Sequence, residues 1–285
     1  MVAISLAMVA CLSWGLSSFL AGTKSRVLPV LTLLFLPGIV CMAMLIFCVA
    51  FRGVAFPADP KLLYAVLGGA AGLFGLYCLY RGLAVGAISV VVPISALSVI
   101  IPVLTGFAMG EVLNSMQIIG IVIAVAGGLF VCIEKKTEVH RKRFVAGIIP
   151  ALGAALGFGV FFVAMDPAGA VDPLWAAMIS RTSSFLFLLP AVMLKRPPLK
   201  IKSVHLPAVV AIGVLEGTAL FFYTTATTQG MLGVVSVISS LYPAVSVILA
   251  AIFLKEKLAG TQMIGIFMTL FGIVCIAYTS ANNIT

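Results

Sequence analysis

The sequence has very little charge. Only 9% of its 285 residues are Asp, Glu, Lys or Arg, whereas 63% are hydrophobic. A water-soluble domain has about 25% charged residues, which form its polar surface. No stretch of this chain is long and polar enough to fold as a separate soluble domain, and bilayer hydrocarbon is the solvent that requires no polar surface. The composition therefore predicts an all-α integral membrane protein.

Sequence motifs of enzymes and metal sites are also missing. No HExxH, GxSxG or P-loop pattern occurs, and the two histidines, His140 and His205, lie in or beside basic stretches. The six cysteines lie in apolar runs without a CxxC pair, so we interpret them as small hydrophobic side chains. We therefore expect no metal, no cofactor and no enzyme activity.

What the sequence does contain is a series of about ten apolar runs. Each has about 19–24 residues, the length of one membrane-spanning helix. The first run lacks the basic segment of a signal peptide, so we count it as a span. The expected spans are residues 2–22, 29–51, 62–83, 86–109, 115–133, 145–166, 172–194, 206–228, 231–254 and 261–280.

The chain also repeats itself. Residues 90–127 align without gaps with residues 145 positions further on, and the polar and glycine matches are informative because apolar matches arise by composition alone. The first spans match more weakly, with Gly15 opposite Gly159 at an offset of 144. The informative pairs in the first alignment are Ser95 with Ser240, Glu111 with Glu256, Gln117 with Gln262, Gly120 with Gly265 and Gly127 with Gly272.

The repeat predicts how the chain is organised. We expect one transmembrane domain made of two five-helix repeats, residues 1–138 and residues 139–285. Because five is an odd number of crossings, the second repeat must be inverted relative to the first. Two inverted five-helix repeats around a site near the bilayer midplane are typical of secondary transporters.

Basic residues are concentrated in every second break between the spans. The even-numbered breaks and the two termini hold only Arg52 and Lys61. The positive-inside rule therefore places the odd-numbered breaks in the cytoplasm and both termini outside it, in a multi-pass protein of the plasma (inner) membrane. This pattern accounts for the net charge of +9 without nucleic-acid binding. The odd-numbered breaks hold Lys24, Arg26, Arg81, Lys135, Lys136, Arg141, Lys142, Arg143, Lys195, Arg196, Lys200, Lys202, Lys255 and Lys257.

A family resemblance rests on the second repeat and on its copy in the first. The second repeat carries Phe221-Phe222-Tyr223, Tyr242-Pro243, Lys255-Glu256-Lys257-Leu258, Gln262, Gly265 and Gly272. The first carries Trp14-Gly15, Gly110-Glu111, Leu113, Gln117, Gly120 and Gly127. Over essentially its whole length the chain resembles an EamA-type transporter of the drug/metabolite transporter superfamily.

This resemblance implies ten spans around a central cavity and secondary transport, commonly export of amino acids or other metabolites. The sequence departs from the family pattern at two places in the first repeat. Ser98 stands opposite Pro243, and Pro37 stands opposite Arg181. We therefore expect an asymmetric site.

Two charged residues are the main site candidates. Glu216 lies about ten residues into span eight, and Arg181 lies at a similar depth in span seven. Charges at mid-depth are costly and mark solute or proton pathways. The alternatives are a structural Glu216 and an Arg181 that only partners it or backbone carbonyls. If the two meet, Glu216 could hold an ammonium group and Arg181 a carboxylate, which would favour zwitterions.

Further candidates line the expected cavity or interrupt its helices, although each could instead serve helix packing. Glu111 and Glu256 we interpret as structural, because each stands just before a span, where a carboxylate satisfies free N–H groups. The aromatic candidates are Trp14, Phe74, Tyr80, Phe158, Tyr223 and Tyr242, the hydroxyl candidates are Ser95, Ser239 and Ser240, and the helix-break candidates are Pro93, Pro102 and Pro243.

The function that we predict is secondary active transport of a small organic metabolite by alternating access, with an amino acid as the expected kind of solute and export as the expected direction. Without a P-loop, the energy must come from a gradient, such as a proton gradient, or from an exchange partner. An intramembrane enzyme and a channel remain as alternatives. The sequence leaves homodimer formation open.

Overall fold

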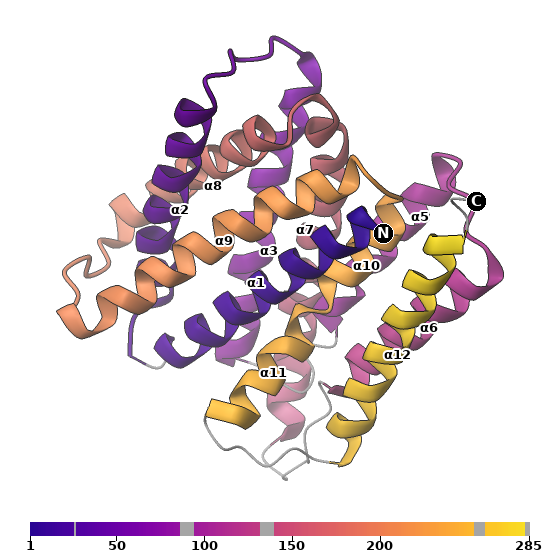
Figure 1. Cartoon of the computed structure of the whole chain (residues 1–285). Helices are drawn as coiled ribbons and strands as arrows, with labels where there is room; N and C mark the ends of the chain where they lie inside the picture. Colours follow the sequence, from indigo (N-terminus) through magenta and orange to yellow (C-terminus); the bar gives the residue numbers. More distant parts are fainter. Residues whose placement is uncertain (26, 86–93, 132–139, 254–259, 283–285) are drawn as a thin grey trace.

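The computed structural model describes the whole chain except residues 26, 86–93, 132–139, 254–259 and 283–285. The described residues form one bundle of helices joined by short connections (Figure 1). The elements are α1 (Val2–Lys24), α2 (Val30–Arg52), η1 (Pro60–Leu62), α3 (Leu63–Val85), η2 (Leu97–Val99), α5 (Ile100–Ala108), α6 (Ser115–Val131), α7 (His140–Val171), α8 (Pro173–Lys195), η3 (Ser203–His205), α9 (Leu206–Thr227), α10 (Leu232–Ser240), α11 (Tyr242–Phe253) and α12 (Gly260–Asn282).

These helices coincide with the predicted spans, which confirms the all-α membrane fold. In the described part of the chain, seven helical stretches are long and apolar enough to cross a membrane. Three shorter apolar stretches stand where spans four, five and ten were expected, at Ile94–Ala108, Ser115–Phe130 and Met263–Cys275. Seven long and three shorter stretches together make the ten expected spans.

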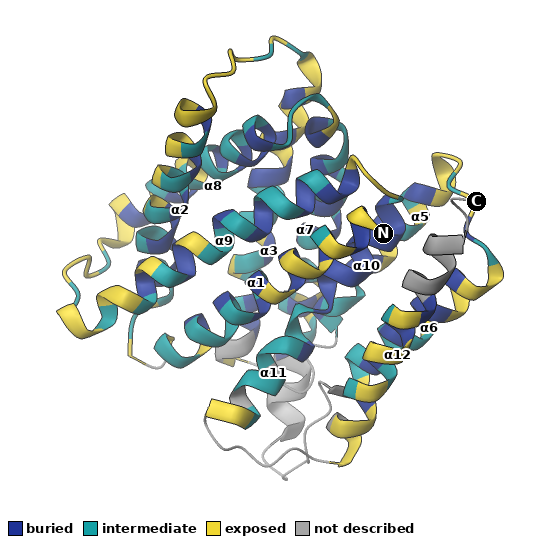
Figure 2. Ribbon diagram, in the orientation of Figure 1, coloured by how far each residue is buried: buried dark blue, intermediate teal, exposed yellow. Residues whose placement is uncertain are grey.

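The outside of the bundle is apolar. Large side chains such as Phe47 and Phe267 are each 68% exposed, and exposed positions run along the outer faces of α2, α6 and α12 (Figure 2). A protein in water does not expose apolar surface on this scale, because burying such surface is the main driving force for folding. The outer surface is therefore suited to contact with lipid.

The connections alternate between the two ends of the bundle. The start of α1, the end of α12 and the connections that follow α2, α5, α7 and α9 lie at one end, which we call the N-terminal end (Figure 1). The connections that follow α1 and α8 lie at the opposite end (Figure 1). Lys24, Lys195 and Arg196 belong to that opposite end. The predicted sorting of basic residues by break number is thus reproduced as a sorting by end.

Spans four and nine are interrupted. Span nine consists of α10 and α11, which are separated at Leu241, and Pro243 stands in the first turn of α11. Proline fits a first helical turn, because the N–H that it lacks would have no partner there. Span four contains the 3₁₀ turn η2 before α5, and Pro102 lies in the first turn of α5. Pro93 lies outside the described residues.

The two halves exchange contacts reciprocally. Helix α1 packs against α9, and α7, the counterpart of α1 in the sequence repeat, packs against α3, the counterpart of α9. Two further pairs of counterparts, α2 with α8 and α6 with α12, pack against each other. A pseudo-twofold axis between the halves produces this pattern of contacts. Helices of each half therefore pack between helices of the other half.

Individual glycines show the same exchange. Gly127 and Gly272 are counterparts in the repeat. A Cβ at Gly127 would stand 2.5 Å from the backbone N of Thr269, and a Cβ at Gly272 would stand 2.6 Å from the backbone N of Ala124. Thr269 and Ala124 are themselves 145 residues apart. In both places the absence of a side chain lets α6 and α12 approach until their backbones touch, as small residues do at interfaces between membrane helices.

We predict that Gly127→Ala destabilises the protein, because the new methyl group overlaps the backbone of α12 and the two helices must separate. Overpacking of this kind costs about 1–3 kcal/mol. The measurement is the melting temperature of the detergent-solubilised protein. Gly22→Ala in α1 is the matched control, since nothing lies within 4 Å of a Cβ there. Equal melting temperatures for the two variants would contradict the close α6–α12 contact.

Candidate functional site

Arg181 and Glu216 form an ion pair in the middle of the bundle. Nη2 of Arg181, on α8, donates to Oε2 of Glu216, on α9, over 3.1 Å. Glu216 lies about ten residues, or about 15 Å, from the start of α9, which places the pair near mid-depth. The hydroxyl of Ser17, on α1, donates to the other carboxylate oxygen over 2.9 Å. Both oxygens of Glu216 are therefore engaged, one by each half of the chain.

The surroundings of the pair are tight on one side only. The Cys41 thiol of α2 lies beside the Arg181 side chain, and a Cβ at Gly217 of α9 would touch its sulfur at 3.2 Å. The side chains of Arg181 and Glu216 nevertheless keep 18% and 25% of their surface exposed. Among the described residues, the buried Nε of Arg181 has no hydrogen-bond partner. One donor of the guanidinium is therefore buried without a partner in the part of the chain that the structure describes, while both side chains of the pair keep some exposed surface.

The pair resolves the electrostatic problem that each residue poses alone. A lone charge in a low-dielectric interior costs several kcal/mol, and pairing offsets much of that cost without making the pair a strong source of stability. An ion pair with exposed surface can exchange partners. A solute that carries both a carboxylate and an ammonium group could bind Arg181 through its carboxylate and Glu216 through its ammonium group.

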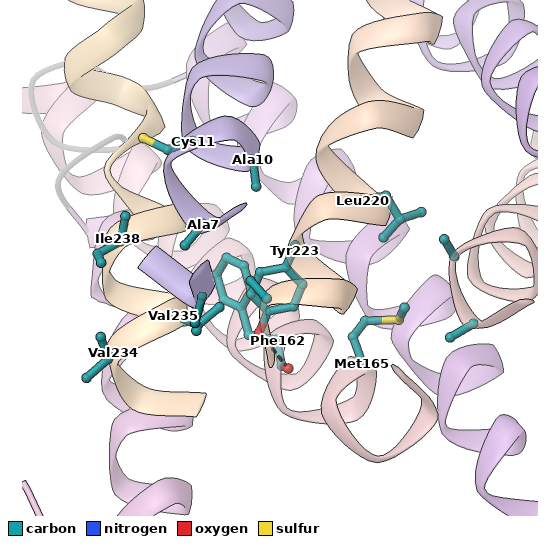
Figure 3. Packing of buried hydrophobic residues seen from close by; sticks show 14 of the residues in the cluster. Ala7, Ala10, Cys11, Phe162, Met165, Leu220, Tyr223, Val234, Val235 and Ile238 are labelled. Carbon is teal, nitrogen blue, oxygen red and sulfur yellow. Dashed lines mark hydrogen bonds between the residues drawn. The ribbon is translucent and has the colours of Figure 1, made fainter. Parts of the chain in front are cut away.

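Tyr223 and Trp14, both predicted site residues, meet in an aromatic cluster with Phe161 and Phe162. The ring of Tyr223 lies 5.0 Å from that of Phe162, beside it in Figure 3. It lies 5.8 Å from the ring of Trp14. Tyr223 is fully buried, and its hydroxyl donates to the Phe162 carbonyl over 2.9 Å and pairs with the Ser236 hydroxyl at 3.0 Å. The hydroxyl of Tyr223 is thus occupied by α7 and α10 in this conformation.

The aromatic cluster lies next to the ion pair along the bundle. Trp14 precedes Ser17 by three residues, so the two lie on one face of α1 about 4.5 Å apart along its axis. Tyr223 follows Glu216 by seven residues on α9. Both steps lead toward the N-terminal end of the bundle. The cluster therefore borders the ion pair on that side.

The remaining aromatic candidates lie around these two groups. Tyr80 of α3 packs against the apolar cluster of Leu34, Leu188 and Val192. It also lies within the range of electrostatic interaction with Glu216. Phe158 of α7 packs where a Cβ at Gly75 would touch its ring. The third, Phe74, is 49% exposed, and its ring lies beside Gly153 of α7.

The candidates at the interruption of span nine contact α1 and span four. Ser240 donates to the Val237 carbonyl over 2.8 Å, as a helix-packing serine does. Ser240 and Pro243 line a very small pocket together with Ala96, Val99 and Gly128. The backbone carbonyl of Tyr242 accepts from Ser246 at 3.3 Å. The buried hydroxyl of Ser239 has no hydrogen-bond partner in the described part of the chain.

Glu111 serves a helix other than the expected one. The sequence predicted that it begins span five, but α6 begins with Asn114 and Gln117, whose side chains bond each other's backbone N–H at 3.0 and 2.8 Å. Glu111 instead accepts from the N–H groups of Leu232 and Gly233, the latter at 3.1 Å, at the start of α10. The structural interpretation stands, while the partner lies in the other half. Glu256 lies outside the described residues.

The residues in and around these groups that sequence reasoning missed are Ser17, Cys41, Phe161, Phe162, Asp166 and Ser236. Ser17, Cys41 and Phe161 carry no signal in the sequence, because serine, cysteine and phenylalanine are ordinary in membrane helices. Asp166 does carry a signal in the sequence. Like Glu216, it is a carboxylate in an apolar run, although it stands at the end of its run. The side chain of Asp166 lies beside Thr227 and near Glu111.

Comparison with known proteins assigns the fold to a family. The chain is a multi-pass α-helical membrane protein with duplicated halves, and residues 1–133 and 145–278 each match the EamA-like transporter family. The chain therefore belongs to the EamA-like transporter family, within the drug/metabolite transporter superfamily. This is a family of transporters and not of enzymes, as the absence of enzyme motifs predicted.

Two individual matches carry no function, and one of them shows the fold. One solved structure, described as "Crystal structure of protein", is 20% identical, superposes with a TM-score of 0.81 and covers 99% of each chain. An uncharacterized protein of Methanocaldococcus jannaschii is 37% identical over 70 residues, which are 25% of this chain. The chain spans half the length of that curated relative.

We predict that Arg181 and Glu216 are coupled in stability. Arg181→Gln or Glu216→Gln alone leaves a charge without its partner, so the double variant should lose about 1–3 kcal/mol less than the sum of the single losses. Chemical unfolding in detergent measures the three variants. The control is the pair of Arg52 and Asp172, 2.8 Å apart near the N-terminal end of the bundle, where coupling of about 0–1 kcal/mol is expected. Additive losses at positions 181 and 216 would show that the pair does not form.

Proposed function

We propose that this protein is a secondary active transporter of a small zwitterionic metabolite, such as an amino acid, which it exports by alternating access. The observation that carries the proposal is the Arg181–Glu216 ion pair at mid-depth, with exposed surface on both side chains. Family membership supports transport. Export is the direction that the family resemblance implies.

The chemistry of the pair suits a zwitterion. A solute carboxylate would compete with Glu216 for Arg181, whose planar guanidinium binds carboxylates in bidentate geometry. A solute ammonium group would then take the Glu216 carboxylate together with the Ser17 hydroxyl. With the solute bound, Arg181 and Glu216 would each have an opposite charge beside them, as they have in each other when no solute is bound.

The reciprocal contacts support the rest of the proposal. Each half, residues 1–138 and 139–285, has five crossings, so a pseudo-twofold axis between them lies in the membrane plane and inverts one half. Inverted halves can exchange conformations, and this exchange opens a central site alternately to each side. Positive-inside sorting places both termini outside the cytoplasm, in the plasma (inner) membrane. A channel, the remaining alternative, would need no such exchange.

We predict opposite ligand preferences for two charge variants. The probes are leucine, leucinamide, which lacks the carboxylate, and N-acetylleucine, which lacks the amine. Arg181→Gln should weaken leucine and N-acetylleucine roughly 10- to 100-fold and spare leucinamide, because a hydrogen bond to a charged group contributes about 1.5–3 kcal/mol. Glu216→Gln should weaken leucine and leucinamide and spare N-acetylleucine. Ligand-induced shifts in melting temperature measure all nine combinations of protein and probe, with wild type as reference.

Equal weakening of all three probes by both variants would reduce the pair to a structural role and end the zwitterion hypothesis. Flux into liposomes then tests carrier against channel, since the flux through a carrier saturates with solute concentration.

The same liposome assay tests whether transport is coupled to a proton gradient. Glu216→Gln should abolish or uncouple transport driven by a proton gradient, and wild-type uphill transport by this variant would exclude Glu216 as the coupling group.

We predict that a carboxy-terminal reporter that fluoresces only in the cytosol stays dark in cells. The physical reason is the concentration of Lys and Arg in the odd-numbered breaks, which resist transfer across the membrane. A reporter fused within the basic 195–202 connection, between α8 and α9, is the control and should be bright. A bright carboxy terminus with a dark 195–202 fusion would reverse the orientation.

A further inference from the structure

The pseudo-twofold relation has a consequence for the site itself. At the offset of 144 residues, Ser17 is the counterpart of Phe161 and Glu216 is the counterpart of Gly72. Both pairs are in contact: Ser17 donates to Glu216, and a Cβ at Gly72 would stand 3.1 Å from Cδ2 of Phe161. The same place in the fold is thus built twice, once with polar side chains and once with an aromatic ring over a glycine.

The third polar residue follows the same rule. Arg181 has Pro37 as its counterpart on α2, and the Pro37 carbonyl lies where a Cβ at Gly213 of α9 would meet it at 2.5 Å. Each polar member of the Arg181–Glu216–Ser17 group therefore has an apolar counterpart. Where Ser17 and Glu216 present polar side chains, Phe161 and Gly72 present only apolar ones.

The ring of Phe161 joins these two sides. It extends from α7 to lie 6.1 Å from the ring of Trp14 on α1 and 6.0 Å from that of Tyr223 on α9. Those are the helices that carry Ser17 and Glu216. Phe162 and Tyr223 are 4% and 0% exposed, whereas Phe161 is only partly buried. Phe161 is therefore the phenylalanine of this adjacent pair that keeps some exposed surface.

We propose that Phe161 is the specificity-determining residue that sets how large an apolar side chain the transported solute can have. The inference rests on the proposed function, because the charges of the solute must be held by Arg181 and Glu216 for its side chain to reach the ring. A solute held there has charged groups against α8 and α9. Its apolar part then points across the axis to the aromatic side, where Phe161 is the boundary.

The position of the Phe161 ring depends on Gly72, because the ring packs against α3 at that glycine. The ring of Phe161 rests on α3 at Gly72, with three of its atoms 3.1 to 3.8 Å from the position of a Cβ. Gly72→Ala would push the ring by a few tenths of an ångström away from α3 and narrow the site. Phe161→Ala would remove the ring and widen it. The two substitutions lie on different helices and should change size selectivity in opposite directions.

The test measures affinities for alanine, leucine, phenylalanine and tryptophan by ligand-induced thermal shift of the full-length protein in detergent. For Phe161→Ala, the ratio of tryptophan affinity to alanine affinity should rise about 10-fold or more, because one methylene in an apolar pocket already changes discrimination by about 10–200-fold. For Gly72→Ala, the same ratio should fall. Phe161→Leu should lie between wild type and Phe161→Ala, and it serves if the alanine variant does not fold.

Phe162→Leu is the matched control, since Phe162 is adjacent, aromatic and buried. It should lower the melting temperature without changing the affinity ratio. The inference is overturned if Phe161→Leu and Gly72→Ala leave the ratio unchanged, or shift it in the same direction, while Arg181→Gln and Glu216→Gln still separate the three leucine probes. If wild type binds none of the amino acids, the proposed function and this inference fail together.

Discussion

Water is absent from the hydrocarbon core of a bilayer, so each polar group that this chain carries into the membrane must find its partner within the protein. Arg181 finds Glu216, and Glu216 finds Ser17 as well. The Tyr223 hydroxyl finds the Phe162 carbonyl and the Ser236 hydroxyl. Most of these bonds join different helices, so they position the helices as well as satisfying the groups.

Several hydrogen bonds also join the two halves of the chain. Ser17 belongs to the first half and Glu216 to the second, and Ser183 and Ser184 of α8 donate to carbonyls of α3 at 2.9 and 2.7 Å. Glu111 ties the connection after α5 to the start of α10. Neither half could satisfy its polar groups alone. The halves are therefore interleaved parts of one transmembrane body, although each has its own copy of the family pattern.

Periodic and compositional features could be predicted from the sequence, because they depend on each segment separately. The lengths of the spans follow from bilayer thickness, and the interruption of span nine follows from the covalent geometry of Pro243. The meeting of Arg181 and Glu216 was expected because two mid-depth charges on consecutive helices have few other partners.

Partners across the two halves could not be predicted in the same way. Glu111 was assigned to the helix that follows it, because a local rule was the only one available, whereas its partner lies 121 residues away. Ser17 was missed for the same reason, since nothing in α1 distinguishes it from Ser13 or Ser18. The repeat contains the missing information, but only after one contact is known. Once Gly72 is seen to touch Phe161, the offset points to Glu216 and Ser17.

The asymmetry of the site follows from the cost of charge. A duplicated frame with a pseudo-twofold axis offers two equivalent places for a polar group, and filling both with ion pairs would double the desolvation cost. One binding site needs one charged side. The second place is then free to become apolar, and in this chain it holds Phe161 over Gly72. The proposed solute, with charges at one end and an apolar group at the other, would match that division, and the proposed alternating access would need only the symmetric backbone around it.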